Sequence, residues 1–283
     1  MKRHAIITGA SSGLGLESAK ALAAAGYNLT LVARGAKRLE DAATQLRAAH
    51  PKLEIKSQIL DVSDFDAVSA FSEGIQEPVD VLMNNAGLMG PDFKLSKQGI
   101  ETQMATNHLG HFVLTAGLWD RLDQSENPKV ISLSSVVHRK GNLDGIDLES
   151  LRGADASKYN RWQRYADTKL ACLYFARELD IRAKLAGSKV QSIAAHPGWA
   201  ITGLQENFPH VLDPFAQTAV QGARSQILAA LSDEIQAGDF VGPKFELWGK
   251  PRVIAGSKRS HNLEVAGRLW TLSEQLTGVK FLA

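Results

Sequence analysis

Short apolar runs alternate with longer amphipathic stretches from one end of the chain to the other. Residues 5–7 and Asn28–Ala33 form apolar runs of the length of buried strands. Ala36–Ala49 and Leu263–Thr277 instead carry their apolar residues at helical spacing. Because strands that alternate with helices form parallel sheets covered on both faces, the pattern predicts one doubly wound α/β domain, a Rossmann fold, over residues 1–283.

The composition narrows the class of protein. The chain has 283 residues, of which 44% are hydrophobic and 22% are charged, as in a globular protein with one sizeable core. Its net charge is +2 without a basic run, so we expect no nucleic-acid partner. Cys172 is the only cysteine, which excludes an intrachain disulfide and a cysteine-based zinc finger. No segment has the roughly 18 uncharged apolar residues of a membrane span, so we expect no membrane span and a cytoplasmic protein.

A glycine-rich turn, residues 8–15, follows the first apolar run and precedes a helix expected over residues 16–25. A strand, a glycine turn and a helix in this order are typical of the start of a dinucleotide-binding unit. Glycine lets the backbone approach a pyrophosphate, and the helix N-terminus offers free amide groups to it. A tight turn without a ligand has the same residues, so the position of the turn carries the interpretation. The candidate cofactor-binding residues here are Gly9, Ser11, Ser12, Gly13, Leu14 and Gly15.

The second strand ends at a basic residue, Arg34. This position lies about 20 residues after the glycine turn, where NAD-binding proteins carry an acid for the ribose 2′-hydroxyl and NADP-binding proteins a basic residue for the 2′-phosphate. We therefore expect NADP(H), with Arg34 as the main phosphate contact and Arg38 or Lys37 as lesser contacts. For Lys37 and Arg38, a role as solvated charges at the start of a helix stays open.

Polar residues follow several of the expected strands. Thr8, Arg34, Asp61 and Asn85 each stand where an apolar strand ends. Ligands of a doubly wound sheet bind at the carboxyl ends of its strands. The four residues therefore predict a single site at that end of the sheet.

Tyr165 and Lys169 lie four residues apart within a long amphipathic stretch. This spacing places both side chains on one face of a helix. A nearby ammonium favours the phenolate, which brings a tyrosine towards the range where it acts as a general acid or base. Two surface residues of an ordinary amphipathic helix would show the same spacing, so the rest of the chain decides between the two interpretations.

Other segments carry weaker signals. His108 and His111 lie in an expected helix, and without a third ligand at matching spacing a packing role is favoured over a metal site. Residues 136–161 are too long for a simple turn, so we expect them to flank the active site with short helical pieces. Residues 203–216 have the composition of a mobile apolar flap, and residues 244–247 show short strand potential.

Several motifs occur in the order and approximate spacing of the short-chain dehydrogenase/reductase family. They are Thr8-Gly9-x-x-x-Gly13-x-Gly15, Asn85-Ala86-Gly87, Asn107, Ser135 and Tyr165-x-x-x-Lys169. The chain resembles this family over nearly its whole length. Within the family, the chain resembles the branch that holds retinol dehydrogenases, WW-domain oxidoreductases and protochlorophyllide reductases. Two features carry this resemblance: the long gap between Ser135 and Tyr165, and the motif Asn107-His108-Leu109-Gly110-His111-Phe112.

The resemblance implies a role for each matching residue. Tyr165 would exchange a proton with the substrate oxygen, and Lys169 would lower the pKa of that phenol and hold the nicotinamide ribose. Ser135, preferred to Ser134 because the family places the catalytic serine second in such a pair, would hydrogen-bond the carbonyl. Asn107 would support a water-linked proton path. The remaining cofactor contacts that the family implies are Asp61, Val62, Asn85, Ala86, Gly87, Pro197, Gly198 and Thr202.

These implications favour an NADP(H)-dependent oxidoreductase that transfers a hydride between the nicotinamide and the carbonyl or alcohol of a lipophilic small molecule. Two alternatives stay open: an NADP(H)-binding sensor or scaffold with little turnover, and a reductase of a carbon–carbon double bond. The complete set of proton-transfer residues favours the enzyme over the sensor. The family is often dimeric or tetrameric, so a homodimer or homotetramer is a further expectation, with the helix that carries Tyr165 packed against its copy.

Overall fold

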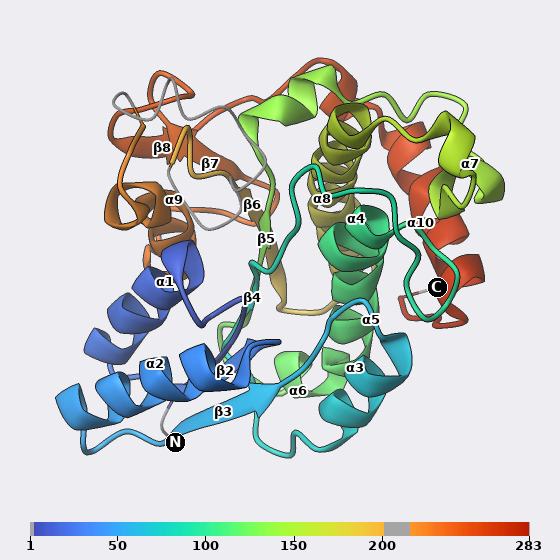
Figure 1. Cartoon of the computed structure of the whole chain (residues 1–283). Helices are drawn as coiled ribbons and strands as arrows, with labels where there is room; N and C mark the ends of the chain where they lie inside the picture. Colours follow the sequence, from blue (N-terminus) through green and yellow to red (C-terminus); the bar gives the residue numbers. More distant parts are fainter. Residues whose placement is uncertain (1–2, 201–215, 283) are drawn as a thin grey trace.

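The computed structural model describes residues 3–200 and 216–282, which form one domain around an eight-stranded sheet (Figure 1). Its strand order is β3-β2-β1-β4-β5-β6-β7-β8. The strands are β1 His4–Thr8, β2 Asn28–Ala33, β3 Ile55–Ile59, β4 Val81–Asn84, β5 Lys129–Leu133, β6 Gln191–Ala195, β7 Phe240–Pro243 and β8 Pro251–Val253. Strands β1 to β7 are parallel, and β8 pairs with β7 in the antiparallel direction. The predicted doubly wound α/β fold is confirmed, with one antiparallel strand added at the edge.

The order of the strands explains their sequences. Strands β1, β4 and β5 lie in the middle of the sheet, and every residue in them is buried. A strand covered on both faces reads as a continuous apolar run instead of an alternating one. Strand β3 lies at one edge and is largely exposed, so its sequence is correspondingly polar.

Helices cover both faces of the sheet (Figure 1). The helices are α1 Gly13–Ala24, α2 Ala36–Ala49, α3 Phe65–Glu73, α4 Thr102–Met104, α5 Gly110–Gly117, α6 Trp119–Asp123, α7 Leu148–Arg152, α8 Arg161–Leu185, α9 Ala219–Leu231 and α10 Leu263–Thr277. One apolar cluster joins the sheet to α1, α2 and α9. A second cluster joins the other face to α3, α5, α8 and α10. The chain therefore folds as three layers. Its longest helix, α8, lies in the layer formed by the second cluster and carries Tyr165 and Lys169.

The segment 136–161 contains short helical pieces, as expected. They are the 3₁₀ turns Val136–Lys140 and Ala156–Lys158 on either side of α7. Asp147 caps α7 through a reciprocal capping box with Ser150. Asn160 then accepts hydrogen bonds from the first amides of α8, which fixes the start of that helix.

The structure contradicts one expectation, refines another and leaves a third outside the described residues. Residues 244–247 form a tight turn and not a strand, because Glu246 has a φ of 63° and the Phe245 amide bonds to the Trp248 carbonyl. The helix that carries His108 and His111 includes a π-helical stretch, Ala105–Leu109, between α4 and α5. The apolar flap proposed at 203–216 lies outside the described residues except for its last residue. No helix in the described part of the chain is long and apolar enough to cross a membrane.

Candidate active site

A cleft of about 550 Å³ opens at the carboxyl ends of the parallel strands. Residues that follow β1, β2, β4, β5 and β6 line it together, so the polar strand ends meet at one site. The residues expected from sequence that line this cleft are Gly9, Ser11, Ser12, Gly13, Leu14, Gly15, Arg34, Arg38, Val62, Asn85, Ala86, Gly87, Ser135, Tyr165, Lys169, Pro197 and Gly198. Asp61 is not among the lining residues, Asn107 lies behind the lining residue Leu88, and Thr202 lies outside the described residues.

The glycine turn has the close backbone approach that a phosphate site needs. Helix α1 begins at Gly13, so its free N-terminal amides face the cleft. A Cβ atom at Gly15 would lie 2.3 Å from the Gly9 carbonyl oxygen, so only glycine fits there. A helix N-terminus with exposed amides attracts anions through its dipole and its donors. The turn therefore fits the pyrophosphate of a dinucleotide.

Thr8 and Asn85 hold the ends of β1 and β4 together beneath this turn. The Thr8 hydroxyl accepts hydrogen bonds from the Asn85 and Ala86 amides, each at 2.9 Å. In return, Asn85 Nδ2 donates to the Thr8 carbonyl at 2.7 Å. The predicted polar residues at these two strand ends thus shape the floor of the cleft.

The basic residues after β2 differ in their position. Arg34 and Arg38 line the cleft, and the Arg38 guanidinium lies over Gly35. Lys37 is instead highly exposed and paired with Asp41 one helical turn away, at 2.9 Å. Of the two lesser candidates for a phosphate contact, the structure therefore favours Arg38.

The Asp61 carboxylate contacts Ser63 and lies near Arg34. Its Oδ1 atom accepts hydrogen bonds from the amide and the hydroxyl of Ser63. Its Oδ2 atom lies 3.8 Å from Arg34 Nη1. The neighbouring residues Leu60 and Val62 line the cleft in its place.

The two serines after β5 have separate roles. The Ser134 hydroxyl is buried and donates to the Lys169 carbonyl at 2.7 Å. Ser135 is only partly buried and caps the 3₁₀ turn that follows, at a long 3.4 Å from the Val137 amide. The Ser135 hydroxyl is therefore the one that can turn to a bound substrate.

Tyr165 and Lys169 lie on successive turns of α8 and both line the cleft. Lys169 Nζ lies 5.7 Å from the centre of the Tyr165 ring and donates to the Leu133 carbonyl at 3.0 Å. Each side chain is less than one-tenth exposed. The expected pairing of a phenol and an ammonium on one helix face is thus present, beside the serine pair at the end of β5.

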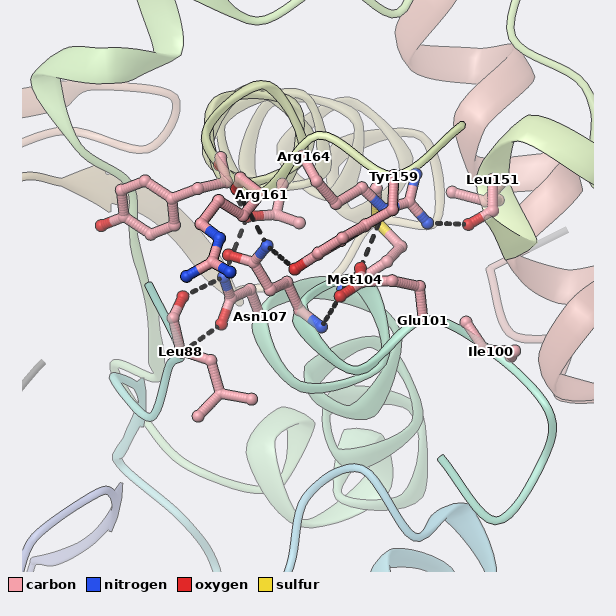
Figure 2. A network of polar contacts seen from close by, with 12 residues as sticks. Leu88, Ile100, Glu101, Met104, Asn107, Leu151, Tyr159, Arg161 and Arg164 are labelled. Atoms are coloured by element: carbon pink, nitrogen blue, oxygen red, sulfur yellow. Dashed lines mark hydrogen bonds and ion pairs between the residues drawn. The ribbon is translucent and has the colours of Figure 1, made fainter. Parts of the chain in front are cut away.

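A polar network behind the cleft joins α4, the π-helical stretch and α8 (Figure 2). The Asn107 side chain exchanges two hydrogen bonds with the Leu88 backbone and donates to Thr168 Oγ1 at 2.9 Å. Arg164 Nε bonds to the fully buried Glu101 at 2.9 Å, and its other nitrogens bond to the Ser150 and Leu151 carbonyls. Arg164 directly precedes Tyr165, so the network fixes the position of α8.

The buried histidines pack and orient neighbouring groups. His111 Nδ1 donates to the Asn107 carbonyl, which leaves Nε2 to accept from the Thr8 hydroxyl at 2.9 Å. His108 bonds to Ser273 in α10 at 2.8 Å. Burial lowers the pKa of His111 to about 4 and the pKa of His108 to about 3, which keeps both rings neutral. The described residues hold no group of three or more His, Cys, Asp or Glu side chains able to bind a metal ion.

Sequence reasoning missed the apolar wall of the cleft. The wall includes Leu88, Met89, Pro91, Val136, Val137, Trp162 and Trp199. Gly90, with a φ of 59°, packs against the Trp162 ring, where a Cβ atom would lie 2.7 Å from the ring. Trp162 stands out in the sequence only as one apolar position of a helix, and its contact with Gly90 joins two distant parts of the chain. That contact carries no local signal.

A comparison with models of protein families supplies the identity of this fold and site. Residues 3–211 match the model described as short chain dehydrogenase. The chain belongs to the short-chain dehydrogenase/reductase family. The resemblance inferred from the motifs is thereby confirmed, and this short-chain dehydrogenase is an oxidoreductase.

Relatives of this short-chain dehydrogenase cover almost the whole chain. Human retinol dehydrogenase 12 is 32% identical over 98% of this chain and 86% of that protein. The crystal structure of an uncharacterized protein from Mycobacterium paratuberculosis has 36% identity and a TM-score of 0.84, and covers 99% of this chain and 94% of that one. The alcohol dehydrogenase of Thermococcus sibiricus, complexed with 5-hydroxy-NADP, has 27% identity and a TM-score of 0.64, and covers 83% and 93% of the two chains.

Proposed function

We propose that this short-chain dehydrogenase transfers a hydride between NADP(H) and the carbonyl or alcohol group of a lipophilic small molecule. The observation that carries the proposal is the convergence of Ser135, Tyr165 and Lys169 in the cleft that also holds the glycine turn. Two relatives, a retinol dehydrogenase and an alcohol dehydrogenase complexed with an NADP derivative, support the same class of reaction.

The residues of the cleft suffice for the proton chemistry of such a reaction. The nicotinamide supplies or accepts the hydride when the cofactor is bound. In the direction of reduction, Ser135 would donate a hydrogen bond to the substrate carbonyl oxygen, and Tyr165 would deliver a proton to that oxygen as negative charge develops on it. Lys169 would stabilise the phenolate left behind and hold the nicotinamide ribose. Asn107 would support a water-linked proton path from behind, since its side chain is bonded to Leu88 and Thr168.

The cofactor would lie across the ends of the first strands. The amides of the glycine turn would hold its pyrophosphate, and Arg34 with Arg38 would bind the 2′-phosphate. Asp61 and Val62 would meet the adenine, and Asp61 Oδ2 lies 3.8 Å from Arg34 Nη1. The rest of the cofactor would contact the remaining residues that the family resemblance implies, which are Asn85, Ala86, Gly87, Pro197, Gly198 and Thr202.

The apolar wall supports a lipophilic substrate. Trp162, Met89, Pro91 and Val137 would present apolar surface next to Ser135 and Tyr165. We place substrate selection in this wall and in the two flanking segments, 136–161 and 203–216.

A cytoplasmic location and a homodimer or homotetramer belong to the same proposal. The oligomer would use a surface other than α8, because most side chains of α8 between Tyr165 and Asp180 are buried within the chain and α10 packs against this helix. This replaces the expectation that α8 packs against its copy.

The test is NADPH consumption by the purified protein across aldehydes, ketones, quinones and enones of graded size. We expect apolar carbonyl compounds to be reduced to alcohols and Tyr165→Phe to lower kcat by at least about 10³-fold. Tyr174→Phe is the matched control, because Tyr174 lies in the same helix but its hydroxyl donates to the Arg259 carbonyl, away from the cleft. Reduction of the carbon–carbon bond of enones alone, or NADPH binding without turnover on any compound, would contradict the proposal.

A further inference from the structure

A short hairpin tip projects two large aromatic rings into solvent. The turn 244–250 joins β7 to the edge strand β8 (Figure 1). Within it, Phe245 is 58% exposed and Trp248 is 54% exposed. Rings of this size are normally buried, so such a cluster on one tip indicates a surface that contacts a partner.

Backbone hydrogen bonds and an ion pair hold the conformation of the tip. The Lys244 amide donates to the Lys250 carbonyl at 3.0 Å, and the Phe245 amide donates to the Trp248 carbonyl at 3.1 Å. Glu246 is paired with Arg139 from the 3₁₀ turn after β5. The two rings are therefore held outward by a fixed backbone, which lowers the entropy cost of placing them in a partner.

The charges on the tip favour an anionic partner. Lys244 and Lys250 are exposed on the turn, and Arg252 is exposed in the adjoining strand β8. Lys244 Nζ lies 5.3 Å from the centre of the Phe245 ring. The single carboxylate of the turn, Glu246, is neutralised by Arg139. Aromatic rings flanked by cations are the composition of segments that lie at the interface of an anionic bilayer.

The size of the tip argues against a protein partner. A stable protein interface takes about 800 Å² from each side, drawn from some 20–30 residues. Two rings on one short turn offer much less area. They can nonetheless insert among lipid headgroups, because insertion needs no complementary flat surface.

We propose that the 244–250 turn is a membrane-docking tip that binds the surface of anionic bilayers through Phe245 and Trp248. The tip is joined directly to the cleft: the Leu247 carbonyl accepts hydrogen bonds from the Trp199 amide at 2.8 Å and from Gln217 Nε2 at 2.9 Å. Docking would thus bring the mouth of the cleft to the lipid surface. The benefit for a lipophilic substrate rests on the proposed function, whereas the binding itself does not.

Co-sedimentation of the full chain with vesicles of phosphatidylcholine, with and without phosphatidylglycerol, tests the proposal in the absence of NADPH and substrate. We expect binding only with phosphatidylglycerol, and weaker binding at high salt. A lysine or arginine near an anionic surface contributes about fivefold to the partition coefficient, so replacing Lys244, Lys250 and Arg252 by Gln should lower it on the order of 100-fold. Replacing Phe245 and Trp248 by Ser should abolish retention at moderate salt.

Leu185→Ser is the matched control, because Leu185 is 82% exposed at the far end of α8 and should leave binding unchanged. A blue shift of fluorescence on binding that disappears in Trp248→Phe would show that the ring enters the interface. The proposal is overturned if the wild-type protein does not bind these vesicles, or if the Phe245 and Trp248 double variant binds as tightly. It is also overturned if size exclusion shows that the rings hold a dimer together and no vesicle binding occurs. A catalytically inactive protein that still binds vesicles would contradict the proposed function alone.

Discussion

The two halves of the cleft are held in place by different kinds of contact. The cofactor half consists of three short stretches, residues 9–15, 34–38 and 85–87, each directly after a strand. The catalytic half consists of Ser135 after β5 and of Tyr165 and Lys169 on α8, a helix held by long-range bonds from Lys169 to Leu133 and from Arg164 to Glu101. A strand followed by a glycine turn can be recognised from a local pattern, whereas a long-range network is visible only in the folded chain.

The network around Arg164 offers the strongest way to break the catalytic half. Arg164→Met would leave Glu101, which is fully buried, without its counter-charge. We expect the free energy of unfolding in urea to fall by about 3–5 kcal/mol. Arg161→Met removes a partly exposed pair with Asp92 and should cost at most about 1 kcal/mol. Equal losses in the two variants would show that the buried network does not hold α8.

Of the two adjacent serines, Ser135 is expected to act on the substrate and Ser134 to stabilise the fold. Ser135→Ala should lower kcat by about 10²-fold, because it removes a donor to the developing oxyanion. Ser134→Ala should lower kcat less than tenfold but reduce the free energy of unfolding by about 0.5–1.5 kcal/mol, since the bond to the Lys169 carbonyl is lost. Steady-state kinetics and urea unfolding of both variants test the assignment. A larger kinetic effect from Ser134→Ala would reverse the roles of the two serines.

The buried histidines make the contact between the two halves testable by pH. His111 bonds to Thr8, which directly precedes the glycine turn, and to Asn107 behind the catalytic half. Burial lowers the pKa of His108 to about 3, of His111 to about 4 and of His196 to about 3, from an ordinary value of 6.5. The unfolded chain then binds more protons than the native state below pH 6.5. The buried neutral histidines therefore contribute fully to the free energy of unfolding above pH 6.5, and this contribution is lost as the pH falls towards 4.

Each of these histidines should contribute up to about 1.4 kcal/mol per pH unit to the fall in the free energy of unfolding between pH 6.5 and 4. Urea unfolding at a series of pH values measures the slope, and His111→Gln should make it shallower. A free energy of unfolding that stays constant over this range would contradict the neutral, buried state of the rings.

Much of the fold and of the cofactor half follows from sequence. The limits of β2, α2 and α10 agree with the expected ones, because buried strands and amphipathic helices show their period locally. The turn at 244–247 was expected as a strand because its apolar residues alternate with polar ones. Its backbone conformation at Glu246 and its exposed rings have no signal in that pattern.

The site was predictable where a residue follows its own strand and less so elsewhere. Arg34 and the glycine turn belong to the first case. The Asp61 carboxylate accepts a hydrogen bond from the Ser63 hydroxyl, a local contact that the strand pattern alone does not show. The contact of Trp162 with Gly90 depends on how α8 packs near the end of β4, which no short pattern encodes.

The central claim is that the cofactor half binds NADP(H) while the catalytic half performs the chemistry. Its most direct test is to measure, in Arg34→Asp and Tyr165→Phe side by side, the Kd for NADPH and NADH and the rate of hydride transfer at saturating cofactor. We predict that Arg34→Asp raises the Kd for NADPH by about 10–100-fold, changes that for NADH far less, and retains the rate. Tyr165→Phe should retain both Kd values and lose the rate. Equal weakening of NADPH and NADH in Arg34→Asp, or most of the rate surviving in Tyr165→Phe, would contradict the account.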